Sequence, residues 1–169
     1  QKQTARLSGL RARPGVIRDV PRIVFLSEPI DVDYGREARG FDQYEAFVQL
    51  CGVLPFQKAL KLEVKLHPRE SEKRWRRFIA ECQTHVSIEI GLTKDPIELL
   101  LVEADGLLGM TTMVLLEAHL LGRPILSLQP GRTQMVNPII DTFCNPVVDA
   151  ENLSSHLMTF QKNFGQACD

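Results

Sequence analysis

The chain has 169 residues, of which 44% are hydrophobic and 24% are charged, and its formal net charge is −1. This balance is typical of a globular domain that buries its own core, and it excludes a disordered chain. The near-neutral charge argues against nucleic-acid binding by the whole surface. No apolar run reaches the ~18 residues that span a bilayer, so we expect a cytoplasmic protein, with the inner face of the membrane as an alternative location.

Residues 1–21 form a basic stretch whose only acidic residue is Asp19. The stretch lacks the aromatic residues that stack on single-stranded nucleic acid, so we interpret it as an arm or a linker. The numbering begins at Gln1. We therefore expect residues 22–169 to be one domain of a longer, two-domain protein. The four cysteines lack C-x-x-C spacing, which predicts reduced thiols rather than disulfides or a zinc site.

Apolar strand-like runs alternate along the chain with segments of helical period, which indicates an α/β domain. The predicted strands are 22–27, 62–66, 86–90, 106–110, 124–128 and a short edge strand at 146–148. The predicted helices are 42–53, 71–83, a short helix that begins at Asp95-Pro96, 112–121 and 153–164. The fold class that follows is a Rossmann-like three-layer sandwich with a mainly parallel sheet of about six strands.

Candidate ligand residues follow four of the predicted strands. Open parallel sheets bind ligands beyond the carboxyl ends of their strands, so we expect these segments to line one nucleotide-binding cleft. The residues predicted to bind there are Ser27, His67, Arg69, Gly109, Thr111, Thr112 and Arg132.

The run from Gly109 to Pro130 indicates a strand end, a turn, a helix and a second strand. Thr111 and Thr112 would open the helix, where free backbone N–H groups and the helix dipole can hold a phosphate. Glu117 would lie further along the same helix and could accept hydrogen bonds from a ribose diol. The alternatives are that the threonines only cap the helix and that Glu117 is a solvated surface residue.

His67 ends the second strand, and Pro68 stops that strand directly after it. We expect His67 to donate to a phosphate oxygen, because an imidazole can change its charge near neutral pH. The alternative is that His67 caps the strand by bonding to a backbone carbonyl.

Several other polar residues are predicted to have structural roles. His85 and His119 have no carboxylate or cysteine at metal-ligand spacing, so we expect no metal site. Asp31 and Asp33 lack the full calcium-loop pattern and are predicted to be loop acids. The basic cluster between Lys73 and Arg77 is interpreted as a solvated helix face, with contact to anionic lipid headgroups as the alternative.

The order of the motifs resembles that of a known family. The segment from Thr111 through Glu117-Ala118 to Gly122-Arg-Pro-Ile-Leu126 resembles the donor half of GT-B fold glycosyltransferases, and sugar-nucleotide 2-epimerases share it. The segments 23–29, 64–70, 96–98 and 109–112 together are similar to the bacterial sialyltransferase and polysialyltransferase group, with its His-Pro and serine/threonine motifs. The likeness covers about residues 22 to 130.

The resemblance implies a site for a CMP-activated sugar, with no metal or other cofactor. His67 would be the catalytic group that stabilises the leaving phosphate, together with Thr111 and Thr112. Arg132 would assist, and Glu98 or Glu117 would hold the cytidine or the ribose. This chain departs from the family pattern in three ways. It has threonines for the usual serines, Ser27-Glu28-Pro29 where glycine-glutamine-proline is commoner, and no acidic acceptor-activating motif.

The sequence therefore predicts the donor-binding, carboxy-terminal domain of a GT-B glycosyltransferase that acts in cell-surface or capsular polysaccharide synthesis. The saccharide acceptor and the catalytic base would come from a missing amino-terminal domain, so the chain alone would bind its donor without catalysis. Peripheral membrane contact is a further expectation, and no nucleic-acid partner is expected. The alternatives are a UDP-sugar 2-epimerase-like isomerase and a non-catalytic α/β interaction module.

Overall fold

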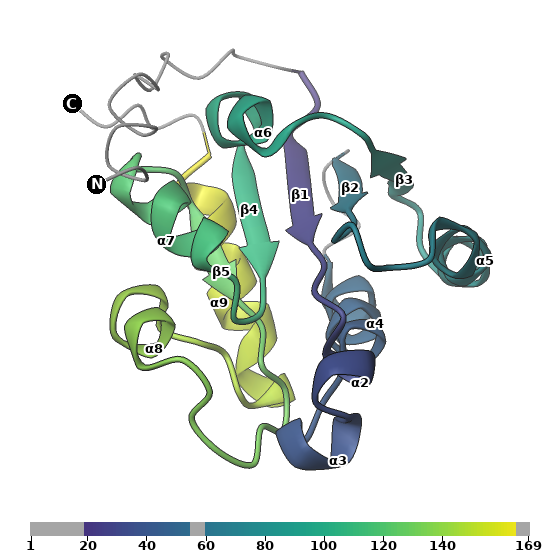
Figure 1. The fold of residues 1–169 in the computed structure, drawn as a ribbon. Helices are drawn as coiled ribbons and strands as arrows, with labels where there is room; N and C mark the ends of the chain where they lie inside the picture. Colours follow the sequence, from purple (N-terminus) through teal and green to yellow (C-terminus); the bar gives the residue numbers. More distant parts are fainter. Residues whose placement is uncertain (1–18, 55–59, 165–169) are drawn as a thin grey trace.

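A computed structural model describes residues 19–54 and 60–164 of the chain. Its centre is a parallel five-stranded sheet in the order β3-β2-β1-β4-β5 (Figure 1). The strands are β1 (Arg22–Leu26), β2 (Lys61–Lys65), β3 (Glu89–Thr93), β4 (Gly106–Gly109) and β5 (Ile125–Ser127). Most of the predicted basic arm, residues 1–18, lies outside the described residues.

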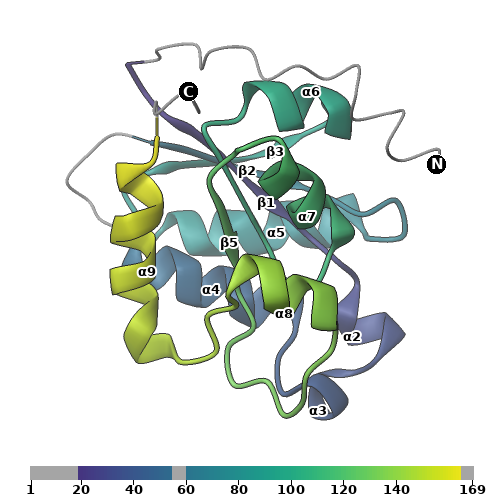
Figure 2. The same cartoon turned by 90° about the vertical axis from the view of Figure 1, so that its left-hand side faces the viewer.

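Helices cover both faces of the sheet and complete three layers. The helices are α2 (Ile30–Asp33), α3 (Arg36–Arg39), α4 (Gln43–Val53), α5 (Glu72–Gln83), α6 (Ile97–Glu103), α7 (Met113–Leu120), α8 (Pro138–Cys144) and α9 (Ala150–Lys162). One core joins the sheet to α4, α5 and α9, and the other joins it to α6, α7 and α8. In Figure 2 the β5 edge faces the viewer, with α4 and α9 on one side of the sheet and α7 and α8 on the other.

The order of apolar and charged residues in each strand follows from how the helices cover the two faces of the sheet. β1 and β4 lie in the middle of the sheet and are apolar on both faces after Arg22. β2 alternates instead, with Leu62 and Val64 fully buried in the core and the charged residues Lys61, Glu63 and Lys65 at the alternate positions. One of those charged residues, Glu63, is buried (7% exposed) beneath the guanidinium of Arg22, whose Nε lies 2.6 Å from its carboxylate.

Local capping explains where the main helices begin. Asp42 accepts hydrogen bonds from the N–H groups of Tyr44 and Glu45, and the Glu45 side chain accepts one from the N–H of Asp42, which is a complete capping box for α4. Ser71 caps α5 and Asn137 caps α8. α8 is not among the predicted helices, although Asn137-Pro138 is a strong helix-start signal.

The predicted boundaries of the third strand and of the short helix were wrong. The third strand occupies 89–93 rather than 86–90, because the Gln83 amide bonds to the carbonyls of Val86 and Ile88 and holds the preceding residues in a turn. The short helix is α6, which starts at Ile97, and Asp95 pairs with Arg22 (2.7 Å) instead of capping it.

The sixth strand is reduced to one bridge between Leu128 and Val147. Asn145 has φ of 42° and Pro146 has no N–H, so neither extends the ladder before Val147.

In the described part of the chain, no helix is long and apolar enough to cross a membrane. Cys51, Cys82 and Cys144 are free and buried, and Cys168 lies outside the described residues. Among residues 19–54 and 60–164, no group of three or more His, Cys, Asp or Glu side chains could hold a metal ion.

Candidate functional site

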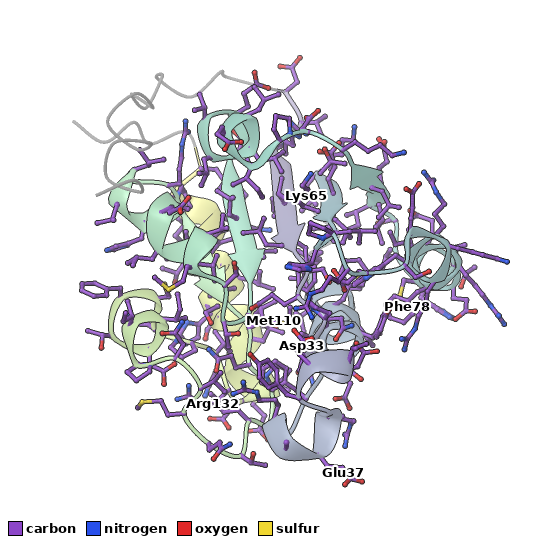
Figure 3. The ribbon with its side chains drawn as sticks, in the orientation of Figure 1. Asp33, Glu37, Lys65, Phe78, Met110 and Arg132 are labelled. Atoms are coloured by element: carbon purple, nitrogen blue, oxygen red, sulfur yellow. The ribbon has the colours of Figure 1, made fainter. Side chains whose placement is uncertain are left out.

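The strand order reverses between β1 and β4, and that reversal defines where a ligand would bind. The chain leaves β1 toward β2 and β3 on one side, and β4 and β5 lie on the other side. In open α/β sheets the crevice beyond the carboxyl ends of such a strand pair is the usual ligand site. Figure 1 shows α2 and α3 beyond the carboxyl end of β1, and Figure 3 labels Asp33, Met110 and Arg132 in this region.

The start of α7 holds a carboxylate of the chain itself. The N–H of Thr111 lies 2.7 Å from one oxygen of Glu28, and the Thr111 hydroxyl donates to the other oxygen at 2.8 Å. Burial raises the pKa of Glu28, while the hydrogen bonds from Thr111 act in the opposite direction. The donors that we predicted for a phosphate therefore exist, and in this structure they bind Glu28.

Thr112 and Gly109 shape the same turn. Thr112 is the N-cap residue of α7, and its hydroxyl accepts a hydrogen bond from the N–H of Val114 at 3.3 Å. A Cβ atom on Gly109 would lie 3.2 Å from Thr112 Cγ2 and 3.3 Å from Leu115 Cδ1. Gly109 therefore lets α7 pack closely on the end of β4, and the space beside it is filled by protein.

His67 is held in one orientation by the turn that follows β2. Its Nδ1 accepts the backbone N–H of Arg69 at 3.2 Å, and its carbonyl accepts the N–H of Glu70 at 2.9 Å. A neutral imidazole with Nδ1 as acceptor carries its proton on Nε2, which is then a hydrogen-bond donor. The imidazole is half-buried at the carboxyl edge.

Glu70 has a role at this edge that was not predicted from the sequence. Its carboxylate accepts three hydrogen bonds, from the Ser27 hydroxyl (2.7 Å), the Trp75 indole N–H (3.0 Å) and the backbone N–H of His67 (2.9 Å). It thereby ties the ends of β1 and β2 to α5. Ser27, predicted to bind ligand, is only 6% exposed, and its hydroxyl donates a hydrogen bond to Glu70.

The cations of the edge are paired with carboxylates. Arg69 donates from both terminal nitrogens to the two oxygens of Asp33, each at 2.5 Å, and the hydrogen bond lowers the pKa of Asp33. Arg132 donates to Asp141 at 2.6 Å and to Gln129 at 3.2 Å. A phosphate that used either guanidinium would have to share it with these partners.

The two glutamates that were alternative candidates for holding the nucleoside lie on different helices. Glu117 is in the middle of α7 and is only 7% exposed, so the predicted solvated alternative is wrong. Glu98 is exposed in the first turn of α6. Figures 1 and 2 place α6 beside the starts of β1 and β4. Thr111 follows the carboxyl end of β4, at the opposite end of the sheet.

Two loops from opposite sides of the switch point meet beside the site. The carbonyl of Arg39 accepts the N–H of Thr133 at 3.1 Å, and the carbonyl of Ala38 accepts its hydroxyl at 3.0 Å. Gly40 has φ of 84°, and a Cβ there would lie 2.2 Å from the carbonyl oxygen of Gly131. This contact fixes the loop after β5 against the segment that follows β1.

The predicted basic helix face is exposed but partly neutralised. Arg74 pairs with Asp31 at 2.7 Å, and Arg76 pairs with Glu72 at 2.6 Å. Asp31 and Asp33 therefore act as counter-ions of neighbouring arginines.

Comparison with known proteins gives no family, since no family model and no curated protein matches the sequence. Several solved structures share the fold. UDP-GlcNAc 2-epimerase from Methanocaldococcus jannaschii matches 93% of this chain and 42% of its own, with 20% identity and a TM-score of 0.51. Anabaena HepE, solved in complex with UDP-glucose, matches 95% of this chain and 45% of its own, with 14% identity and a TM-score of 0.52.

A third structure has the same fold and a different activity. The catalytic domain of the Thermotoga maritima CheB methylesterase matches 83% of this chain and 98% of its own, with 10% identity and a TM-score of 0.52. At these identities the likeness is one of fold, and the predicted fold class, a Rossmann-like half of a GT-B fold, is confirmed with five strands. The chain spans less than half of the epimerase and of HepE.

Proposed function

We propose that this chain is the donor-binding domain of a GT-B glycosyltransferase and that it binds a nucleotide sugar at the carboxyl edge of its sheet. The phosphates would lie between the end of β2 and the start of α7. β1 separates these elements, and neighbouring strands lie about 4.8 Å apart, so the two ends flank one narrow site. The acceptor site and the catalytic base would belong to a further domain. This agrees with the match to HepE, of which the chain spans 45%.

The contact between Glu28 and Thr111 is the observation that carries the proposal. An N–H and a hydroxyl converge on two anionic oxygens at 2.7 and 2.8 Å, at the topological switch point of the sheet. A phosphate presents oxygens of the same charge at similar spacing. The start of α7 is therefore built to hold an anion, and a helix N-terminus adds its dipole to that attraction.

His67 is proposed to stabilise the leaving phosphate. Its Nε2–H would donate to a phosphate oxygen, and stabilisation of developing negative charge by a fixed donor is a recognised source of rate enhancement. The chemistry needs no metal, because His67 and the α7 start supply the electrostatic stabilisation.

Two classes of donor are compatible with the site. The resemblance to the sialyltransferase group favours a CMP-sugar and a role in cell-surface polysaccharide synthesis. A UDP-sugar is the alternative, since the epimerase and HepE, which share the fold, are named with UDP-sugars. A UDP-sugar 2-epimerase-like isomerase would share that preference.

Calorimetric titration of the purified chain with CMP, CDP, UDP and GDP, with and without magnesium, tests the proposal. Selective CMP binding without magnesium supports a CMP-sugar donor, and UDP preference supports the alternative class. His67→Ala should weaken binding, whereas His85→Ala, on an exposed residue beyond α5, should not. If a folded chain binds no nucleotide at millimolar concentration, the chain alone is not a donor-binding domain.

A further inference from the structure

We infer that Glu28 is the internal competitor of the donor phosphate, and that it sets the affinity of this site. The inference rests on the proposed function. A phosphate reaches the Thr111 donors only when it displaces the Glu28 carboxylate from them. Ligand binding would then replace the Glu28 carboxylate at Thr111 with the phosphate.

The contacts leave no room for both anions. Glu28 uses one oxygen for the Thr111 N–H and the other for the Thr111 hydroxyl, so both donors are engaged. A backbone N–H has a single hydrogen and bonds well to one acceptor at a time. A phosphate oxygen on the same N–H would also lie against the carboxylate, where like charges repel.

The backbone around Glu28 is fixed, so the exchange is confined to its side chain. The N–H of Ser27 donates to the carbonyl of Lys65 at 2.9 Å, and the N–H of Ile30 donates to the carbonyl of Glu28 at 2.8 Å. Pro29 restricts the next φ angle. Rotation of the Glu28 side chain would break its contacts with Thr111 and with the backbone of Met110 and Thr112. It would leave the backbone bonds of Ser27 and Ile30 intact.

A glutamine in place of Glu28 isolates the role of the charge. Its side-chain oxygen can accept one of the same hydrogen bonds, while the side chain carries no charge. An uncharged side chain of this length would yield to a phosphate more readily. Glu28 therefore lowers the affinity for phosphate groups relative to a glutamine at the same place.

The test compares four proteins in calorimetric titrations with inorganic pyrophosphate, CMP and UDP. They are the wild type, Glu28→Gln, Glu28→Asp and a control, Glu89→Gln. Glu89 is an exposed residue of β3, and its substitution makes the same change in net charge. We expect Glu28→Gln to bind at least tenfold more tightly than the wild type, Glu28→Asp to be intermediate because its shorter side chain reaches Thr111 poorly, and the control to be unchanged.

Amide NMR of Thr111 locates the effect. In Glu28→Gln its signal should move on addition of pyrophosphate at lower concentration than in the wild type. Equal or weaker binding by Glu28→Gln overturns the inference. If the wild type and the variant bind nucleotide equally, with no change at Thr111, the inference fails while the proposed function stands. If none of the folded proteins binds any of the three probes, both fail.

Should Glu28→Gln not fold, Glu28→Asp decides by the same criterion. Tighter binding than the wild type supports competition, and equal or weaker binding refutes it.

Discussion

Glu70→Ala should destabilise the protein more than any other single change at the carboxyl edge. The substitution removes an acceptor that receives hydrogen bonds from Ser27, His67 and Trp75. Trp75 is fully buried and Ser27 is 6% exposed, so water cannot replace the lost acceptor for either donor. We therefore expect a loss that is large for a polar residue.

The magnitude follows from the two buried donors. A buried donor left without an acceptor costs about 1–3 kcal/mol, and the backbone N–H of His67 can turn to solvent at lower cost. We expect Glu70→Ala to lower the free energy of unfolding by about 3–5 kcal/mol. Glu70→Gln retains one acceptor oxygen and should cost about 1–2 kcal/mol, while Ser27→Ala removes only one donor and should cost about 1 kcal/mol.

Urea unfolding followed by tryptophan fluorescence measures these values, since Trp75 is the only tryptophan of the chain. A double-mutant cycle between Ser27→Ala and Glu70→Ala isolates their hydrogen bond, and we expect a coupling energy of about 1 kcal/mol. The reasoning is refuted if Glu70→Ala costs less than about 1 kcal/mol, or if the two substitutions are additive.

Three further predictions concern other parts of the structure. Gly40→Ala should destabilise by about 2–4 kcal/mol, because its Cβ meets the Gly131 carbonyl at 2.2 Å in addition to the strain of a positive φ. A Cβ on Gly131 would lie 3.6 Å from the Gly40 carbonyl oxygen, an ordinary van der Waals contact, so Gly131→Ala should cost only about 1–2 kcal/mol from its positive φ. Equal losses for the two variants in thermal unfolding would contradict the close contact at Gly40. Burial raises the pKa of Cys51 to about 12. Iodoacetamide at pH 8 should therefore modify this thiol slowly in the native protein and quickly in urea, as measured by mass spectrometry. Rapid modification of the native protein would argue against this burial. The Arg69 guanidinium lowers the pKa of Asp33, so this pair stabilises the fold above the unfolded pKa of the carboxyl and loses that effect as pH falls through the folded value. Asp33→Asn should therefore reduce the fall in the free energy of unfolding at acid pH, and the reduction should be smaller in 1 M salt because salt screens exposed charges. If the substitution leaves the acid dependence at low salt unchanged, the Asp33–Arg69 pair does not contribute to stability.

The fold class was predictable from the sequence because it depends on local patterns. Apolar runs such as Ile23–Leu26 alternate with helical segments, and that alternation indicates a parallel sheet covered on both faces. The start of α7 was found within one residue, since Thr112 is a cap that acts on its own neighbours. The third strand was misplaced because Gln83, a side chain of the preceding helix, decides where it begins.

The sequence by itself determined which residues come to the carboxyl edge, since parallel strands bring their ends together regardless of packing detail. It identified His67, Thr111 and Arg132 there. Tertiary structure alone decided how their donors are used, because hydrogen-bond partners distant in sequence leave no local pattern. Thr111 is bound by a carboxylate 83 residues away, and Ser27 by one 43 residues away. Burial of Glu117 and the distance of Glu98 from the site likewise follow from how α6 and α7 pack on the sheet, which no spacing in the chain records.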